Sequence, residues 1–322
     1  VHDGVMLTPP RPPAGPLPPK VVVLGSFVHA HWWSVARLPG AGESCLAHAV
    51  HSELGGKGLN VAIGIHRLGV EVDLVVGVGR DAAAQELAGL LAREGIAQQH
   101  VYPVAAHSGR GAGLVDAAGE NSIAVFPGAN MDIGASEIAQ AAQAIGGASL
   151  VYGQLEMAAD AVLAAFTVAR TQGVRTVLNA SPAAGVSPAL LAVTDVLVVN
   201  AGEAAQLMAM GALDGARDGA PAFMARWPGH ALVVTMGAMG SEVFVRGQPP
   251  YRQAAMPARE GGDSAGAGDG FAAGLCAALA QGLGWPQAMQ LASQCGAAVA
   301  SGKGVLDHLP RGSVGHMLRP AV

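Results

Sequence analysis

The sequence predicts an α/β fold, a three-layer αβα sandwich with a mainly parallel central sheet and a small β-sheet lid. Hydrophobic residues make up 51% of the 322 residues and charged residues only 13%, so most strands should be buried on both faces. Between about 150 and 210, short β-branched runs alternate with helical patterns, which indicates βαβ units with right-handed crossovers. Half-exposed alternating segments earlier in the chain predict the second, smaller sheet.

The ends of the chain are predicted to lie outside this fold. Residues 1–19 hold seven prolines, too many for a helix or a sheet, and predict a disordered tail. Residues 20–311 are predicted to form one large domain, and residues 312–322 a C-terminal tail. The lid is assigned to two segments inserted into that domain, about 27–53 and 101–127.

The elements follow in order from these patterns. Residues 21–24 form a β-branched run that ends in glycine, as a buried first strand does. The 58–68 segment carries apolar residues at helical spacing and is closed by Gly69. The remaining predictions are strands at 72–77, 101–104, 111–117, 122–126, 150–152, 175–179 and 196–200, helices at 82–94, 135–145, 158–171 and 202–210, and a hairpin-like segment at 231–255.

Composition narrows the classes of function. The net charge of −5, without a Lys/Arg cluster, argues against a nucleic-acid partner. Cys45, Cys276 and Cys295 are an odd set without metal-site spacing, as expected for reduced thiols. Apolar windows are too short for a bilayer, and no signal-peptide pattern is present. We therefore expect a cytoplasmic protein without a membrane partner.

The most informative segment is Asp263–Gly274, in which three closely spaced glycines (Gly266, Gly268 and Gly270) and Asp269 open an Ala-rich helix. A Gly/Ala turn lets backbone N–H groups approach an anion, and the helix N-terminus adds partial positive charge. A carboxylate in the first turn could take a proton from a substrate hydroxyl as a phosphoryl group arrives. The alternative is structural, with Asp269 as a helix cap and the glycines as a turn.

A second Gly-rich segment, Gly55–Asn60, lies between a predicted strand and a helix. Backbone N–H groups, the Lys57 ammonium and the Asn60 amide could bind a ligand there. The segment is not a Walker A loop, because the spacing of its glycines is wrong and no Ser or Thr follows Lys57. A tight turn with a solvated lysine is the structural alternative.

Together, Gly55–Gly69 and Asp263–Gly274 resemble the two signatures of the PfkB, or ribokinase-like, carbohydrate kinase family, and the likeness extends over about 20–310. The resemblance implies a kinase that uses ATP and Mg²⁺ to phosphorylate a primary hydroxyl of a sugar or sugar-like acceptor and that forms a homodimer through its lid. It implies these roles: Asp269 as catalytic base; Gly266, Ala267 and Gly268 as the anion hole; Gly56, Lys57, Asn60 and Glu156 as sugar contacts; Asn200 and Glu203 near the phosphates and Mg²⁺; Thr235, Gly237 and Gly240 on the nucleotide side, with adenine near 294–298.

Members of the family also carry a monovalent-cation site near the anion hole. The resemblance places a K⁺ site here at Asp263, Ser264, Val299, Gly304 and His308. Oxygen ligands from Asp263 and a backbone-rich loop suit this hard cation. The family often has a small hydroxyl residue where this chain has His308.

The chain departs from the family after its first strand. The family reads Gly-Ser-x-Asn-x-Asp, whose Asn and Asp hold sugar hydroxyls, whereas this chain has Val28 and Ala30 at those positions. Ribose held in the usual way is therefore disfavoured. Either His29, His31 or another lid residue substitutes, or the acceptor presents an apolar part, as a nucleoside would. For the two histidines, exposed strand positions are the alternative.

Two functions of other classes remain open. A non-catalytic nucleotide or sugar sensor would keep the fold but would not need Asp269. Gly262–Gly266 also fits the Gly-x-Ser-x-Gly pattern of a serine hydrolase, with Ser264 as nucleophile and Asp307 and His308 later in the chain. That pattern requires an apolar strand directly before it, and the preceding segment carries Pro, Arg and Glu.

Overall fold

The computed structural model describes residues 18–209, 219–259, 262 and 264–319. Within them, the central sheet has the strand order β13-β12-β11-β10-β9-β8-β1-β4-β5. Strands from β11 to β5 are parallel, and β12 and β13 continue the sheet antiparallel. The bounds are β1 Lys20–Leu24, β4 Glu71–Gly79, β5 Val101–Ala105, β8 Leu150–Gln154, β9 Arg175–Asn179, β10 Val196–Asn200, β11 Ala231–Thr235, β12 Ser241–Val245 and β13 Tyr251–Gln253. The predicted mainly parallel sheet is confirmed.

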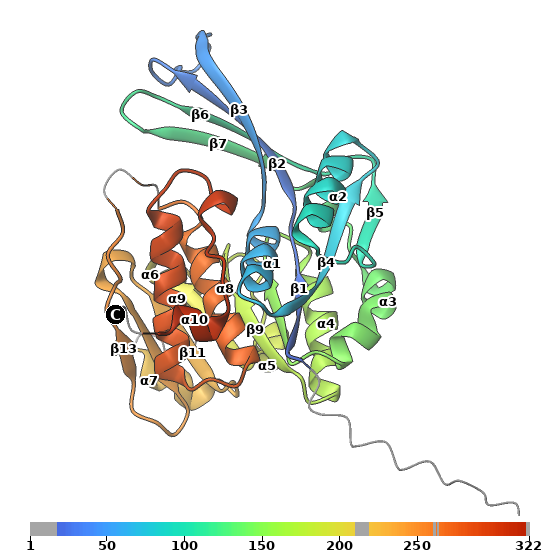
Figure 1. The fold of residues 1–322 in the computed structure, drawn as a ribbon, viewed down its shortest axis with the longest axis vertical. Coiled ribbons are helices and arrows are strands. Elements are labelled where there is room, and N and C mark those ends of the chain that lie inside the picture. The colour runs from blue at the N-terminus through green and yellow to red at the C-terminus, as the bar shows by residue number, and fades with distance from the viewer. Residues whose placement is uncertain (1–17, 210–218, 260–261, 263, 320–322) are drawn as a thin grey trace, which may run out of the picture.

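Helices cover both faces of this sheet (Figure 1). Successive residues of β1 point to opposite faces, so Val21 and Val23 join one core cluster and Val22 and Leu24 the other. The first cluster packs under α1 Lys57–Arg67, α2 Ala82–Glu94, α8 Ala267–Ala280, α9 Trp285–Ala300 and α10 Val314–Met317. The second packs under α3 Ala135–Gly146, α4 Ala159–Thr171, α5 Pro188–Ala192, α6 Ala201–Ala209 and α7 Ala220–Arg226.

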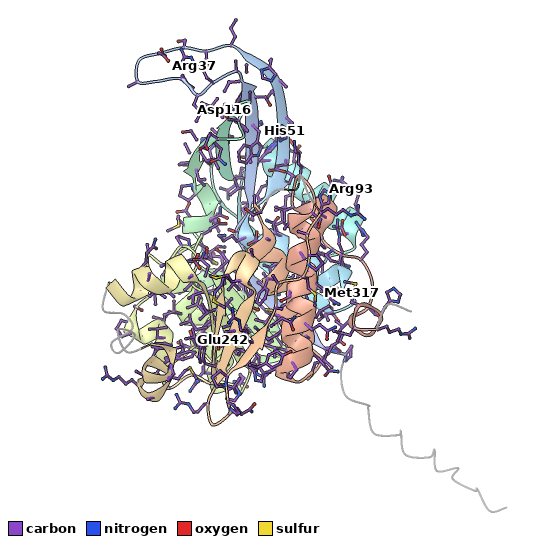
Figure 2. The ribbon with its side chains drawn as sticks, turned by 90° about the vertical axis from the view of Figure 1, so that its left-hand side faces the viewer. Arg37, His51, Arg93, Asp116, Glu242 and Met317 are labelled. Atoms are coloured by element: carbon purple, nitrogen blue, oxygen red, sulfur yellow. The ribbon has the colours of Figure 1, made fainter. Side chains whose placement is uncertain are left out.

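A separate four-stranded sheet, which we call the lid, stands beyond the carboxyl end of β1 (Figures 1 and 2). Its strand order is β3-β2-β6-β7, with β2 Val28–Val35, β3 Ala47–Gly55, β6 Gly109–Val115 and β7 Asn121–Phe126. Strand β2 follows β1 almost directly, and β3 leads into α1, so the lid rises from the same edge as α1. Arg37 and Asp116 mark its far end in Figure 2.

Three parts of the predicted organisation differ from the structure. Strand β5 pairs with β4, so the predicted lid segment 101–127 divides between the two sheets. Residues 312–319 are not a tail, because α10 buries Val314 against the core. The 231–255 segment forms three strands rather than one hairpin. Residues 1–17 of the predicted N-terminal tail lie outside the described residues.

Helix packing brings the two Gly-rich segments together. Helices α1 and α8 lie side by side, and a Cβ on Gly64 would stand 2.6 Å from the Cβ of Ala273. Both helices therefore begin at the carboxyl edge of the sheet, where parallel α/β folds bind ligands. Within the described residues, none of the helices has the length and apolar character needed to cross a membrane.

Candidate active site

Asp269 and the Gly55–Asn60 segment are in direct contact, although they lie more than 200 residues apart in the sequence. The Asn60 side-chain amide donates a hydrogen bond from Nδ2 to Asp269 Oδ2 over 2.8 Å. Lys57 Nζ lies 3.9 Å from Asp269 Oδ1. Lys57 and Asn60 belong to the first turn of α1, and Asp269 to the first turn of α8. The two motifs therefore form one site.

Glycine is required where these helices begin. A Cβ on Gly58 would lie 2.1 Å from the Cα of Gly25, so only glycine lets α1 start this close to the loop after β1. Gly266, the N-cap of α8, has φ +73°, in the left-handed region that glycine adopts without strain. Its Cβ would also lie 2.3 Å from Cγ2 of Val305.

Asp269 is a buried carboxylate, 4% exposed. Burial raises its pKa to about 6, because it disfavours the charged form more than the attraction of Lys57 and the Asn60 hydrogen bond favour it. Burial lowers the pKa of Lys57, but the attraction of Asp269, Glu156 and Glu203 outweighs this, so its pKa lies above the usual value. At neutral pH the site holds an ionised acid beside a cation.

Glu156 is fixed by groups that follow β1 and begin α1. Its Oε2 accepts hydrogen bonds from the Ser26 hydroxyl, at 2.7 Å, and from the Lys57 backbone amide, at 2.9 Å. The Ser26 Oγ in turn accepts from the Gly58 amide at 3.2 Å. We did not predict a role for Ser26; its place directly after the first strand was the available signal.

Asn130 fixes the base of the lid and was not predicted. Its side chain pairs with both backbone groups of Phe27, accepting from N at 2.9 Å and donating to O at 2.8 Å. It also donates to the carbonyl of Pro127 at 2.9 Å. These bonds tie the start of β2 to the segment that follows β7.

A cleft of about 580 Å³, which we call the lid cleft, lies between the lid and Asp269. Val28, Ala30 and Trp32 line it, in agreement with strand alternation. Its lining residues are Val28, Ala30, Trp32, Glu53, Leu54, Gly55, Gly56, Lys57, Asn60, Leu90, Arg93, Gly111, Ala112, Gly113, Ile123, Val125, Glu156, Ala265, Gly266, Asp269, Gly304, Val305, Leu306 and Asp307.

His29 and His31 alternate with these residues and belong to the opposite face of the lid. Their rings lie 4.6 Å apart, and His29 Nε2 lies 3.8 Å from Oε2 of Glu86 on α2. The hypothesis that either histidine replaces the missing polar contacts in the cleft is wrong. Strand alternation, which directs Val28 and Ala30 inward, directs them outward.

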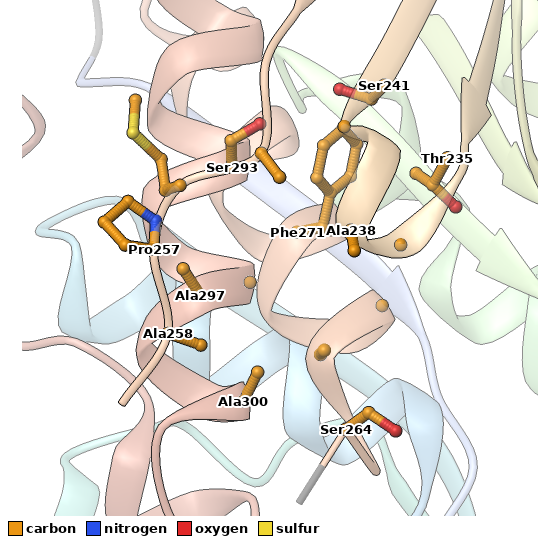
Figure 3. Close-up of a pocket in the computed structure, with 17 residues that line it drawn as sticks. Thr235, Ala238, Ser241, Pro257, Ala258, Ser264, Phe271, Ser293, Ala297 and Ala300 are labelled. Carbon is orange, nitrogen blue, oxygen red and sulfur yellow. The ribbon is translucent and has the colours of Figure 1, made fainter. Parts of the chain in front are cut away.

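A second cavity, of about 590 Å³, lies between α8, α9 and the β11–β12 turn and is called the α8–α9 cavity (Figure 3). Thr235, Gly237 and Gly240 line it, as do Gly296 and Ala297 from the predicted adenine segment. Other walls come from Met256, Pro257, Ala258, Phe271 and Ala300. Ala267 and Gly268 also line it, so this cavity and the lid cleft meet the same first turn of α8.

Asn200 and Glu203 lie elsewhere, in a third cavity of about 620 Å³ that we call the β9–β10 cavity. Their side chains and amides are reciprocally bonded: Asn200 N donates to Glu203 Oε2 at 2.9 Å, and Glu203 N to Asn200 Oδ1 at 2.8 Å. Lys57 and Glu156 line both this cavity and the lid cleft. The predicted phosphate-side pair is therefore beside Glu156.

The predicted K⁺ residues are only partly described, since Asp263 lies outside the described residues. Ser264 lines the α8–α9 cavity, whereas Gly304 lines the lid cleft, and Val299 is buried in the core. His308 donates from Nδ1 to the Gly304 carbonyl at 3.0 Å. The contacts of the described residues leave the K⁺ site a prediction.

The same contacts bear on the hydrolase alternative. Among the described residues, no hydrogen bond joins Ser264 to His308, whose ring lies against Gly302 instead. An activated serine needs a base within hydrogen-bond reach. Asp307 is exposed and adjacent to His308 in the short η4 turn, Leu306–His308. The geometry gives this alternative no support.

The model of the pfkB family of carbohydrate kinases matches residues 18–311. The chain belongs to this family. It is 30% identical to mouse (Mus musculus) ribokinase over 263 residues, 81% of each chain. It is also 30% identical to Staphylococcus aureus ribokinase over 239 residues, 73% of this chain and 78% of the relative. As a pfkB family member it is a carbohydrate kinase, a phosphotransferase whose acceptor is an alcohol group.

Solved structures agree on the fold. Arabidopsis thaliana ribokinase, complexed with ribose and ATP, has a TM-score of 0.80 at 23% identity and covers 94% of this chain and 97% of its own. The Burkholderia thailandensis nucleoside kinase, in complex with inosine, has a TM-score of 0.74 at 20% identity, with 92% and 95% covered. Both sugar and nucleoside kinases thus share this architecture.

Proposed function

We propose that this kinase transfers the γ-phosphoryl group of ATP to a hydroxyl of a neutral sugar in the lid cleft, with Asp269 as base. The observation that supports this best is the position of Asp269. It lies on the turn of α8 that the lid cleft shares with the α8–α9 cavity, buried and bonded to Asn60. A donor and an acceptor bound in these two cavities would meet at that turn.

Asp269 has the properties of a general base. With a pKa of about 6 it is ionised at neutral pH, yet close enough to neutrality to accept a proton during reaction. The acceptor hydroxyl gives its proton to the carboxylate while its oxygen bonds to the γ-phosphorus. The bond from that phosphorus to the bridging oxygen breaks, and ADP leaves. Lys57 and Asn60 orient the carboxylate.

The first turn of α8 would stabilise the transferring group. Helix N-termini leave backbone N–H groups without carbonyl partners and carry partial positive charge. The Ala267 amide donates to the Ser264 carbonyl at 3.1 Å, so the amides of Gly266 and Gly268 are better placed to receive a phosphoryl oxygen. Preorganised donors of this kind supply much of the catalysis of phosphoryl transfer.

The nucleotide is proposed to occupy the α8–α9 cavity, with Thr235, Gly237 and Gly240 on its phosphate side. Alanine, proline and phenylalanine walls suit a planar base. Ser241 supports this assignment, because its Oγ is buried, its side chain lines the cavity, and no described residue offers that oxygen a hydrogen bond. A ligand atom would satisfy it.

Mg²⁺ is proposed to accompany the nucleotide near Asn200 and Glu203. The cation is commonly held by one or two carboxylates together with phosphate oxygens, and Glu203 and Glu156 line the same cavity. These donors fit a hard cation. When bound, Mg²⁺ would neutralise charge on the phosphate oxygens.

Sugar hydroxyls are proposed to contact Gly56, Lys57, Asn60 and Glu156. The Oδ1 atom of Asn60 is buried and has no hydrogen-bond partner within the part of the chain that the structure describes, so it can accept a hydrogen bond from a hydroxyl beside Asp269. The ribokinase relatives make a pentose the first candidate. A nucleoside is the second, because the lid presents Val28, Ala30 and Trp32 to the cleft and an apolar wall suits a base.

K⁺ activation and a homodimer through the lid remain parts of this proposal. The face of the lid opposite the cleft carries Trp33, opposite Val50, whose exposed fraction is 64%. Exposed apolar residues on one sheet face favour a second copy of the chain as their cover. Sedimentation velocity tests the dimer, and replacing K⁺ by Na⁺ in the assay tests activation.

The reaction is tested by a coupled ADP-release assay against pentoses, hexoses, their phosphates and nucleosides. We expect ADP formation that requires both ATP and an acceptor, and a product heavier than that acceptor by one phosphoryl group. If no acceptor of these classes stimulates ADP release, the proposed function is wrong. Binding of the acceptors is measured separately by calorimetry.

A further inference from the structure

Among the lid side chains that line the cleft, all but one are apolar; His51, which is stacked on Trp32 on the same face, does not line the cleft. Strand pairing directs Val28, Ala30 and Trp32 of β2 to this face, and Ile123 and Val125 of β7 beside them. None of these side chains accepts a hydrogen bond. If a sugar or a nucleoside binds between these side chains and Asp269, its hydroxyls or amino groups that face the lid have no hydrogen-bond partners there, which is unfavourable in a closed cleft.

Glu53 is the exception, and the register of the lid decides its position. It lies on β3 directly opposite Ala30 of β2, so both side chains point to the cleft. Opposite residues on one face of an antiparallel pair have Cβ atoms about 4.5–5.5 Å apart. The Glu53 side chain therefore starts beside Ala30 on the cleft face, where the family has a carboxylate and this chain has only a methyl group.

Trp32 orients this carboxylate. Its indole Nε1 donates to Glu53 Oε1 at 2.8 Å, and its ring lies across Gly113, where a Cβ would stand 2.3 Å from Cε3. Among the described residues, Glu53 Oε2 receives no hydrogen bond. It points toward the far wall of the cleft, 3.6 Å from the position that a Cβ on Gly304 would occupy.

The charges that line the cleft define what this oxygen can bind. Glu53, Glu156, Asp269 and Asp307 face Lys57 and Arg93, four acids against two bases. Lys57 is already beside Asp269, and Arg93, labelled in Figure 2, is exposed at the rim. A phosphate on the acceptor would meet repulsion from Glu53, and of the two cations that line the cleft only Arg93, at the rim, has no ion pair among the described residues.

From this geometry we infer that Glu53 is a specificity-determining residue that holds the acceptor from the lid side. Its Oε2 accepts hydrogen bonds from a hydroxyl pair or an amino group of the acceptor. The acceptor is therefore neutral or cationic and carries no phosphate of its own. This rests on the proposed function, since it concerns the acceptor of that reaction.

The test compares Glu53→Ala and Glu53→Gln with the wild type, using D-ribose, adenosine and fructose 6-phosphate as probes. For ribose or adenosine, whichever the wild type phosphorylates faster, we expect the acceptor KM to rise about tenfold or more in Glu53→Ala, since hydrogen bonds to charged groups are strong. The KM for ATP should not change, because Glu53 does not line the α8–α9 cavity.

Two further variants test the geometry. In the Glu53→Ala background, Ala30→Asp returns a carboxylate to the same face from the opposite strand, and part of the lost affinity should return. Trp32→Phe keeps the aromatic ring but removes the N–H donor, so acceptor KM should rise less than in Glu53→Ala. Glu120→Gln, an exposed acid in the lid turn, removes the same charge away from the cleft and is the matched control.

Acceptor binding is also measured by calorimetry, which does not depend on turnover. Unchanged acceptor KM and Kd in Glu53→Ala, with an unchanged unfolding temperature, would overturn the inference. So would a wild type that prefers fructose 6-phosphate to ribose and adenosine. If the wild type binds ribose or adenosine through Glu53 but transfers no phosphate, the proposed function fails and the inference stands; if it binds none of the probes, both fail.

Discussion

Replacing Asp269 with asparagine should stabilise the fold while removing activity. Burial raises the pKa of this carboxyl from 3.8 to about 6, so the ionised form is held at the expense of stability. Each unit of pKa corresponds to about 1.4 kcal/mol, which gives about 3 kcal/mol at neutral pH. Asparagine resembles the protonated carboxyl in shape and charge and can still accept the hydrogen bond from Asn60.

The gain should depend on pH with a definite sign. Below pH 3.8 the carboxyl is protonated in both the folded and the unfolded chain, so the penalty is absent. It grows as the pH rises, because the unfolded chain loses its proton first, and it is complete above pH 6. The asparagine variant should therefore gain about 3 kcal/mol at pH 7.5 and about half of that at pH 5.

Urea unfolding at pH 7.5 and pH 5 measures this difference. Asp307→Asn is the matched control, since Asp307 lines the same cleft but is exposed, and its free energy of unfolding should change little. Loss of the base should reduce kcat by a factor of about 10²–10⁴ while the Kd for ATP is retained. An asparagine variant less stable than wild type at pH 7.5, or a gain equal at both pH values, would refute the reasoning.

Three further predictions concern the pH dependence of activity, the start of α8 and the Arg67–Glu94 ion pair. Because Asp269 must be ionised to act as base, kcat/KM should fall about tenfold per pH unit below pH 6. Lys57→Met should move this transition to higher pH, since the attraction of Lys57 lowers the pKa of Asp269. Initial rates from pH 5 to 8 measure both effects, and a profile that does not change with pH contradicts the assignment of the base. Gly266→Ala should lower the free energy of unfolding by about 1–3 kcal/mol, because φ is +73° and Val305 lies in the way. Gly268→Ala should not, because, apart from its own neighbours in the helix, no described atom lies within 4 Å of the added Cβ; equal denaturation midpoints for the two variants would be inconsistent with this. Arg67→Met should lower the free energy of unfolding by about 1–3 kcal/mol, since it removes hydrogen bonds to Glu94 and to the carbonyls of Leu306 and Leu309 while Arg311 still pairs with Glu94, and a thermal unfolding temperature like that of wild type would exclude this role.

Local patterns predicted most of the main fold. The helix at 82–94 and the strands at 175–179 and 196–200 are as predicted, because each carries its own periodicity and terminal residues. Strand β5 shows the limit of this reasoning. The alternation in 101–104 indicates a strand, but only pairing with β4 decides which sheet it joins.

Only the site residues that belong to recognisable sequence motifs could be predicted from the sequence. Lys57, Asn60, Glu156 and Asp269 do come together, whereas His29 and His31, two of the candidates to replace the missing polar contacts, lie on the opposite face of the lid. The raised pKa of Asp269 could not be predicted from its local sequence, because it results from burial by segments that are far apart in the chain.

Contacts between residues that are distant in the sequence could not be predicted, because no local sequence pattern indicates them. The hydrogen bonds between Asn130 and Phe27 join residues 103 positions apart in the sequence. The position of Glu53 opposite Ala30 depends on the register between β2 and β3. A one-residue slip in that register would direct Glu53 to the other face.

The proposed reaction is tested most directly by following the γ-phosphoryl group itself. Wild type and Asp269→Asn are incubated with ATP labelled in that group and with pentoses, hexoses or nucleosides, and the labelled product is isolated. We predict a labelled phosphomonoester of the acceptor from the wild type and a loss of about two orders of magnitude or more in the variant, which still binds ATP. Transfer at wild-type rates by Asp269→Asn, or no labelled acceptor from the wild type with any of these compounds, would contradict it.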